Sequence, residues 1–264
     1  MNLLVSDLDG TLLGDDRALD GFCVWYDQVR DRLRLVYSSG RFFGSIRESI
    51  ARFHLPEPAG VICGVGTEIH DLTTGERIAG WPEAACDWNP LLIRAACAER
   101  PELVEQPGHL LSDFKISYYG HNLSDAYLAR LTRQLDELGQ EVGIVYSSNR
   151  DLDILPAATN KGTAATFLAR HWGIGRDRVI VAGDSGNDLE MFRTGFRGIV
   201  VGNAQPELLS LRDPNVYHAE GHFAAGVLEG LQHWLDDIWT VDSHVDSTSV
   251  RSIPDRDPSR GMRG

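Results

Sequence analysis

The chain has 264 residues, of which 42% are hydrophobic and 24% charged, as in ordinary globular proteins, and it is long enough for one large domain or two of moderate size. Its formal net charge of −13 argues against nucleic acids and anionic membrane surfaces as partners, although a local cation could still hold a phosphorylated small molecule in a cleft. No apolar run approaches the ~20 residues that a membrane-spanning helix needs.

An apolar run at the N-terminus leads into Asp7, Asp9 and a Gly-Thr turn. A short apolar run bounded by glycine is typical of a strand buried in a parallel sheet. Residues two apart on a strand point to the same side, so both carboxylates can face one point beyond its end, where open parallel sheets bind ligands. An acidic loop at a strand end is the ordinary alternative, so the pair alone favours a functional site only modestly.

Strands and helices then alternate. Apolar residues at helical spacing predict helices over residues 15–34 and 42–53, and short apolar runs predict strands over 33–37 and 59–63. This alternation predicts an α/β fold, a doubly wound parallel sheet with helices on both faces.

The next stretch breaks this rhythm. The patterns predict helices over 88–99 and 124–138, and strands over 114–119, 141–146 and 152–156. The rhythm returns with helices over 160–172 and 222–235 and strands over 178–182 and 197–201. We therefore expect a discontinuous core domain over 1–80 and 157–235, a smaller inserted α+β domain over 81–156, and a flexible tail over 236–264, docked at most through Trp239.

Three further segments offer polar groups near strand ends. Ser39 and the backbone N–H groups around it suit a phosphate, although capping a helix is the commoner role for such a serine. Lys161 could bring an ammonium group to the same crevice, although a lysine at a helix start is usually solvated. Asp184, Asn187 and Asp188 on a glycine-containing turn suit a hard cation, and the turn lacks the spacing and distal Glu of a calcium-binding hand.

The four segments together carry the parts that phosphoryl transfer needs. They provide a carboxylate nucleophile, a second carboxylate, a hydroxyl for the phosphate, a cation and a metal site. A carboxylate that attacks phosphorus forms an acyl phosphate, which water then hydrolyses.

These segments resemble the four motifs of haloacid dehalogenase superfamily phosphatases, which use Mg²⁺ and form an aspartyl phosphate. The motifs stand in order as Asp7-Leu8-Asp9-Gly10-Thr11, Ser39-Gly40-Arg41, Lys161, and Gly183-Asp184-Ser185-Gly186-Asn187-Asp188. The resemblance implies a Rossmann-like core with a cap domain inserted between the second and third motifs. Threonine usually stands where this chain has Ser39, and the exchange keeps the hydroxyl.

The resemblance also implies residue roles. Asp7 is the expected nucleophile, and Asp9 is expected to protonate the leaving group and then activate water. Ser39 and Lys161 are expected to hold the phosphoryl oxygens. Mg²⁺ would be bound by Asp7, the backbone carbonyl of Asp9 and Asp184, with Asn187 and Asp188 supporting the metal site. The other expected substrate contacts in the core are Thr11, Gly40, Arg41 and Asn187.

A finer resemblance over residues 1–235 is to the sucrose-phosphate phosphatase group. It is carried by Val65-Gly66-Thr67-Glu68-Ile69, Lys115-Ile116-Ser117-Tyr118-Tyr119, Asp151-Leu152-Asp153-Ile154-Leu155-Pro156 and Val201-Gly202-Asn203-Ala204-Gln205, besides the motifs above. It implies hydrolysis of sucrose 6-phosphate to sucrose and phosphate. The alternatives are mannosylfructose phosphate or glucosylglycerol phosphate as substrate, a phosphosugar mutase, and a degenerate phosphatase that regulates a glycosyltransferase. The intact catalytic set speaks against the last of these.

The candidates for contacts to the sugar in the inserted domain are Lys115, Tyr118, Asp151 and Asp153. An equal alternative is that they are ordinary polar residues on the exposed face of a strand. Packing is the expected role of Trp81, Trp88 and Trp172, and a structural role is expected for His218 and His222. The four cysteines, Cys23, Cys63, Cys86 and Cys97, show no CxxC spacing and no neighbouring histidine cluster, which favours buried reduced thiols.

The start of the chain enters a strand with no basic or signal-like segment, so we expect a cytoplasmic protein. We expect it to act as a monomer, and a sugar-phosphate synthase is the protein partner that the resemblance implies.

Overall fold

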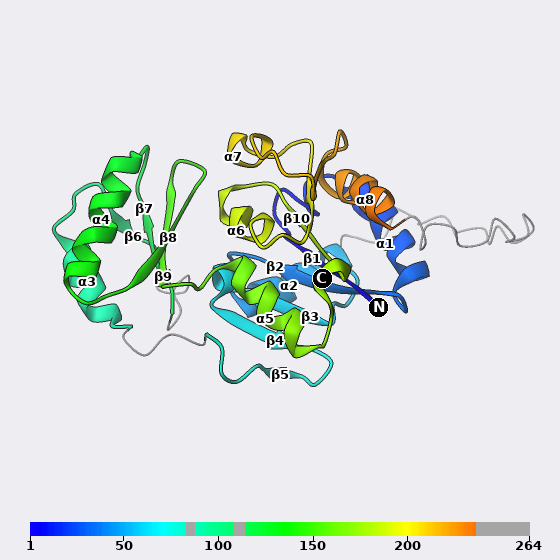
Figure 1. The fold of residues 1–264 in the computed structure, drawn as a ribbon, viewed down its shortest axis with the longest axis horizontal. Coiled ribbons are helices and arrows are strands. Elements are labelled where there is room, and N and C mark those ends of the chain that lie inside the picture. The colour runs from blue at the N-terminus through cyan, green and yellow to red at the C-terminus, as the bar shows by residue number, and fades with distance from the viewer. Residues whose placement is uncertain (83–87, 108–113, 236–264) are drawn as a thin grey trace, which may run out of the picture.

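The computed structural model describes residues 1–82, 88–107 and 114–235, so the predicted tail lies outside the described residues. Within these ranges the strands form two separate sheets, one of eight strands and one of four (Figure 1). The larger sheet contains the predicted core strands, and the smaller belongs to the stretch predicted as an insertion.

The larger sheet is parallel over most of its width. Its strands, in spatial order, are β12 (Val216–His218), β11 (Arg197–Val200), β10 (Val179–Gly183), β1 (Asn2–Ser6), β2 (Leu33–Ser38), β3 (Gly60–Cys63), β4 (Glu68–Asp71) and β5 (Glu76–Arg77). β1 lies between β10 and β2 and pairs in parallel with both. The predicted parallel sheet is confirmed from β12 to β3, whereas β4 and β5 add an antiparallel edge. The chain reverses there because the turn over Gly64–Gly66 is too short for a parallel crossover.

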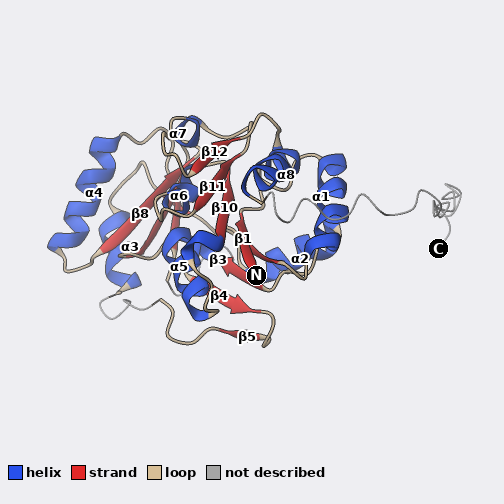
Figure 2. Cartoon of the chain, turned by 45° about the vertical axis from the view of Figure 1, so that its right-hand side comes forward, coloured by secondary structure: helices blue, strands red, loops and turns tan. Residues whose placement is uncertain are grey.

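Helices cover both faces of this sheet. They are α1 (Asp16–Val29), α2 (Phe43–Phe53), α5 (Lys161–His171), α6 (Leu189–Phe192), α7 (Pro206–Leu209) and α8 (Phe223–Trp234). α1, α2 and α8 lie on one side and α5 and α6 on the other (Figure 2). All five residues of β10 are buried, as expected for a strand covered on both faces. None of the helices in the described part of the chain is long and apolar enough to cross a membrane.

The helix predicted over 15–34 is shorter than expected. It ends at Val29, because a turn in which the Arg32 N–H donates to the Val29 carbonyl (2.8 Å) directs the chain into β2. The other predicted helices end within a few residues of their expected bounds.

The described residues between 88 and 156 form a second unit, called the inserted unit below. It contains α3 (Pro90–Ala98), α4 (Asp125–Glu137), β6 (Val104–Glu105), β7 (Ile116–Tyr119), β8 (Val142–Ser147) and β9 (Asp151–Pro156). Its strands are antiparallel in the order β6-β7-β9-β8, and the two helices pack on one face (Figure 1). A hydrophobic cluster that includes Ile116, Leu131 and Ile154 is separate from the core of the larger sheet.

The tryptophans and histidines singled out above have packing roles. The Trp81 indole donates to the Gly66 carbonyl (2.8 Å), the Trp172 indole donates to Asp71 Oδ2 (2.8 Å), and Trp88 packs against the cluster of the inserted unit. His218 Nε2 lies 3.1 Å from the Leu211 carbonyl, and His222 is the N-cap residue of α8.

Candidate active site

A cleft of about 240 Å³ lies where the carboxyl ends of β1, β2 and β10 meet the β8–β9 hairpin of the inserted unit. It is lined by Asp7, Asp9, Ser39, Gly40, Arg41, Ser147, Ser148, Asp151, Asp184, Ser185, Asn187 and Gln205. Three of the four predicted motif segments therefore line one cleft, and the fourth, at Lys161, lies directly beneath it.

The end of β1 places Asp7 in the middle of the sheet edge. The Asp7 N–H donates to the Ala182 carbonyl (3.0 Å), so the backbone pairing of β1 with β10 extends as far as the carboxylate. The chain then turns sharply at Gly10, whose φ is +83°. A Cβ there would lie 2.5 Å from Asp184 Oδ2, so the turn brings the backbone against that carboxylate and requires glycine.

Lys161 joins the carboxylates under the cleft. Its ammonium donates to Asp7 Oδ1 (2.6 Å), Asp188 Oδ1 (2.6 Å) and Asn187 Oδ1 (2.8 Å). The side chain is 0% exposed, which excludes the alternative of a solvated lysine at a helix start. It is held there because Asn160 caps α5 through a reciprocal pair of hydrogen bonds with Thr163, so the helix begins at Lys161.

Asp188 and Thr11 shape the acidic loop after β10. Asp188 Oδ2 accepts hydrogen bonds from the N–H groups of Asp184 (3.1 Å) and Ser185 (3.2 Å), while its other oxygen binds Lys161. Both oxygens of Asp188 are therefore engaged in holding the loop. Thr11 does not line the cleft as expected; it is buried and donates to Asp184 Oδ1 (3.1 Å), which orients that carboxylate.

The acidic cluster formed by Asp7, Asp184 and Asp188 carries more negative charge than the single ammonium of Lys161 neutralises. Burial raises the pKa of Asp7 well above its ordinary value, and the carboxylates of Asp188 and Asp184 add to this, while Lys161 acts in the opposite direction. Burial, with the charge of Asp188, raises the pKa of Asp184 to about 7. Oxygens of Asp7, Asp184 and Asp188 lie within 4.8 Å of one another. Such a set of closely spaced carboxylate oxygens fits a hard divalent cation.

The segment after β2 presents a hydroxyl and a guanidinium. The Ser39 hydroxyl accepts from the Arg41 N–H (3.1 Å), and Phe42, not Ser39, is the N-cap residue of α2, so Ser39 does not cap that helix. The Arg41 guanidinium is ion-paired with Asp9 and donates to Ser49 Oγ (2.6 Å). These contacts leave Ser39 and Arg41 both facing the cleft.

The inserted unit forms one wall of the cleft and makes a hydrogen bond to the core through Lys115. Asp151 lines the cleft as expected. Lys115 lies beside the cleft, where its ammonium donates to the Gly40 carbonyl (3.2 Å) and sits 3.4 Å from Asp153 Oδ1. Asp153 does not line the cleft; it accepts a hydrogen bond from the Ser117 hydroxyl and pairs with Lys115.

Several residues that shape the site were given no individual role in the sequence analysis. Ser147, Ser148, Ser185 and Gln205 line the cleft. Asn203 holds the turn at Gly10, because its Nδ2 donates to the Gly10 carbonyl (2.7 Å) and its Oδ1 accepts from the Phe223 N–H (2.7 Å). Asn203 follows β11, so the rule that polar groups gather at strand ends could have identified it.

The fold is that of haloacid dehalogenase-like hydrolases. A solved structure of such a hydrolase from Bacillus subtilis superposes with a TM-score of 0.62 at 18% identity and covers 88% of this chain and 91% of that chain. The model of the sucrose-6F-phosphate phosphohydrolase family matches residues 1–235, and the chain belongs to this family. The expected class, phosphoric monoester hydrolase, is thereby confirmed.

Individual relatives cover most of the chain. It is 36% identical over 240 residues to mannosylfructose-phosphate phosphatase of Agrobacterium fabrum, covering 89% of this chain and 97% of the relative. It is 32% identical to sucrose-phosphatase 1 of Nicotiana tabacum, covering 88% of this chain but only 59% of that protein. The solved sucrose-phosphatase of Synechocystis, in complex with sucrose and phosphate, superposes with a TM-score of 0.83 at 33% identity and covers 88% of this chain and 97% of that chain.

Proposed function

We propose that this chain is a Mg²⁺-dependent phosphatase that hydrolyses a sugar phosphate, sucrose 6-phosphate, through an aspartyl phosphate on Asp7. One observation carries the proposal. The buried Asp7 carboxylate, bound by Lys161, shares a cleft with Asp9, Ser39 and Asp184. A nucleophile, an acid–base group and groups for the phosphoryl oxygens are thus within one small volume.

Two displacements at phosphorus follow from this arrangement. In the first, Asp7 attacks phosphorus, the bond to the sugar oxygen breaks, and Asp9 gives that oxygen a proton. In the second, Asp9 takes a proton from water as the water oxygen attacks phosphorus, and the acyl phosphate opens to phosphate and the free Asp7 carboxylate. Lys161 and Ser39 stabilise the charge on the transferring oxygens.

The residues that would hold Mg²⁺ are Asp7, Asp184 and the backbone carbonyl of Asp9. Asp188, with both oxygens engaged by the loop and by Lys161, would orient the site and not bind the ion directly. When bound, Mg²⁺ would neutralise negative charge between the carboxylates and the phosphoryl group.

Mg²⁺ affinity is expected to depend on pH through Asp184. Its pKa is raised to about 7, so below this pH the metal must displace a proton, and the affinity should fall by roughly tenfold per pH unit. Titration calorimetry with Mg²⁺ on either side of pH 7 measures this. An affinity that does not change across that range would contradict the proposed role of Asp184.

The Asp184 carboxyl also makes the free energy of unfolding depend on pH when no metal is bound. Because the folded-state pKa of Asp184 is raised, its contribution to the free energy of unfolding is fully present below the ordinary pKa of 3.8 and is lost as pH rises through about 7. Mg²⁺ removes this loss by binding the ionised carboxylate. We therefore expect Mg²⁺ to raise Tm more on the alkaline side of pH 7 than on the acidic side, and Asp184→Asn to remove most of that difference.

We also propose that residues 81–156 act as a cap that closes over the phosphate and excludes water. Lys115, which is 5% exposed, reaches from this segment to donate through its ammonium to the Gly40 carbonyl beside Ser39. Loss of this charge-assisted hydrogen bond in Lys115→Met should disfavour the closed form and raise KM about tenfold. The control is Arg94→Met in the same unit, which removes only a surface ion pair with Glu105 and should leave KM unchanged.

The substrate is tested by phosphate release with Mg²⁺ from sucrose 6-phosphate, mannosylfructose phosphate and glucosylglycerol phosphate, compared as kcat/KM. The family match and the sucrose-bound relative of the same architecture support sucrose 6-phosphate. The Agrobacterium relative supports mannosylfructose phosphate as the second candidate. A preference for mannosylfructose phosphate would replace the proposed substrate but not the chemistry. Transfer of phosphate between sugars without release to water would indicate a mutase instead.

A further inference from the structure

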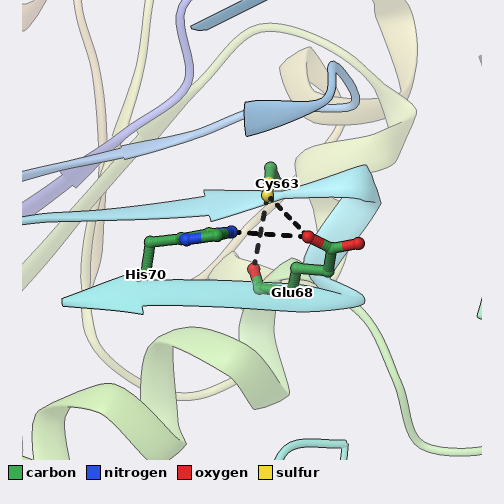
Figure 3. Close-up of side chains that lie close together, drawn as sticks. All are labelled: Cys63, Glu68 and His70. Carbon is green, nitrogen blue, oxygen red and sulfur yellow. Dashed lines mark hydrogen bonds and ion pairs between the residues drawn. The ribbon is translucent and has the colours of Figure 1, made fainter. Parts of the chain in front are cut away.

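Outside the cleft, Cys63, Glu68 and His70 form a second cluster of metal-binding side chains. Cys63 ends β3, while Glu68 and His70 lie two residues apart on β4 (Figure 3). In the antiparallel register, Cys63 lies opposite Glu68, and alternate residues of a strand share one face. The hairpin therefore brings a thiol, a carboxylate and an imidazole to the same face of the sheet.

The distances between these groups are close to those of a tetrahedral zinc site. Glu68 Oε2 lies 3.4 Å from His70 Nε2 and 3.9 Å from Cys63 Sγ. Zn–N and Zn–O bonds of about 2.0 Å and a Zn–S bond of about 2.3 Å at tetrahedral angles would place these pairs roughly 3.3 and 3.5 Å apart. One ligand atom from each residue lies within 4.8 Å of the other two. Shifts of a few tenths of an ångström would bring all three onto one ion.

We propose that Cys63, Glu68 and His70 bind a zinc-class divalent transition metal at a site distinct from the acidic cluster around Asp7. The donor set decides the class of ion, because thiolate and imidazole favour zinc-like metals over Mg²⁺, which prefers oxygen. A water molecule would complete the coordination, as it does in zinc sites with three protein ligands.

Charge and burial agree with this assignment. A thiolate, a carboxylate and a neutral imidazole balance a divalent ion, so the filled site carries no net charge. Cys63 is 1% exposed, so a thiolate at this position would be buried and would need a cation beside it. His70 stacks on the Phe43 ring with centroids 3.9 Å apart, which holds the imidazole plane in position.

The cluster adjoins the segment that presents Ser39. The Gly64 N–H donates to the Arg41 carbonyl (2.9 Å), and the Val65 N–H donates to the Ser39 carbonyl (3.1 Å). Gly64 directly follows Cys63, so an ion at Cys63 would brace the turn on which this segment rests. The proposed site therefore lies on the turn that supports the Ser39 segment.

Cobalt(II) is the probe, because a thiolate ligand produces intense near-ultraviolet charge-transfer absorption that oxygen ligands do not. The full chain is titrated with Co²⁺ in excess Mg²⁺, which occupies the acidic cluster. We expect one equivalent of Co²⁺ to give this absorption and one equivalent of Zn²⁺ to displace it. Cys63→Ser should abolish the absorption, and His70→Gln, which keeps the thiol, should weaken Co²⁺ binding at least about tenfold.

The matched controls are Cys23→Ser, Cys86→Ser and Cys97→Ser, which should leave the absorption unchanged. If Cys63→Ser is too unstable to be titrated, thermal unfolding of the other variants provides an independent test. Zn²⁺ should raise Tm in the native chain and in the three control variants, but not in His70→Gln at the same concentration. Absence of the absorption in the native chain, or its survival in Cys63→Ser, overturns the proposal.

Discussion

Asp7→Asn is expected to lower kcat by at least about 10⁴-fold, because an amide cannot form the acyl phosphate that the mechanism requires. The substitution is nearly isosteric, and Lys161 keeps its contacts to Asp188 and Asn187. Phosphate release from sucrose 6-phosphate at saturating Mg²⁺ measures the effect. Retention of more than a small fraction of the native rate would refute attack by Asp7.

The stability of the Asp7→Asn variant separates loss of chemistry from loss of fold. Burial raises the pKa of Asp7, so its ionised form costs free energy in the metal-free protein at neutral pH. Removal of that charge should leave Tm unchanged or raise it. Asp20→Asn, at an exposed position on α1, is the control and should alter neither rate nor Tm.

Lys161→Met should cause the largest combined loss of activity and stability. It leaves Asp7 and Asp188 buried beside each other without their shared cation, a change that typically costs about 3–5 kcal/mol. Loss of the ammonium from the phosphoryl site should also lower kcat/KM by about 10³-fold. Urea unfolding in EDTA measures the stability loss, which should shrink as pH falls, because protonation of either carboxylate relieves the repulsion.

A second substitution distinguishes repulsion from lost packing. Asp188→Asn in the Lys161→Met background removes one of the two charges but keeps an oxygen to accept from the Asp184 and Ser185 N–H groups. It should restore much of the stability and none of the activity. Arg133→Met, at an exposed position on α4, controls for removal of a positive charge and should leave the free energy of unfolding unchanged. If the double variant is no more stable than Lys161→Met, repulsion between the carboxylates is not the cause.

The core strands and the main site residues could be predicted from the sequence because their signals are local. A run of buried residues predicts a strand, and polar residues directly after several parallel strands must gather at one edge of the sheet. That reasoning placed Asp7, Ser39 and Asp184 at one edge. The structure brings all three into a single cleft.

Other features depended on contacts between distant segments. The complete burial of Lys161 results from the packing of α5 under the acidic loop, and no pattern around residue 161 distinguishes it from a solvated lysine. The sequence predicted that Thr11 and Asp153 contact the substrate. In the structure Thr11 donates to Asp184, and Asp153 pairs with Lys115. When a polar side chain can reach either the substrate or a neighbouring residue, its role can be assigned only once the position of that neighbour is known.

The alternating α/β core, the order of the motifs and the chemistry they imply could be inferred from the residues alone, because hydrophobic periodicity and strand-end residues are local properties. The folded structure sets which polar groups face the cleft and which hold the loops around it. It also places His70 beside Cys63, although no histidine cluster marks the cysteines in the sequence. The reason is the antiparallel return of β4 on β3, which sets cross-strand neighbours by register and not by spacing along the chain.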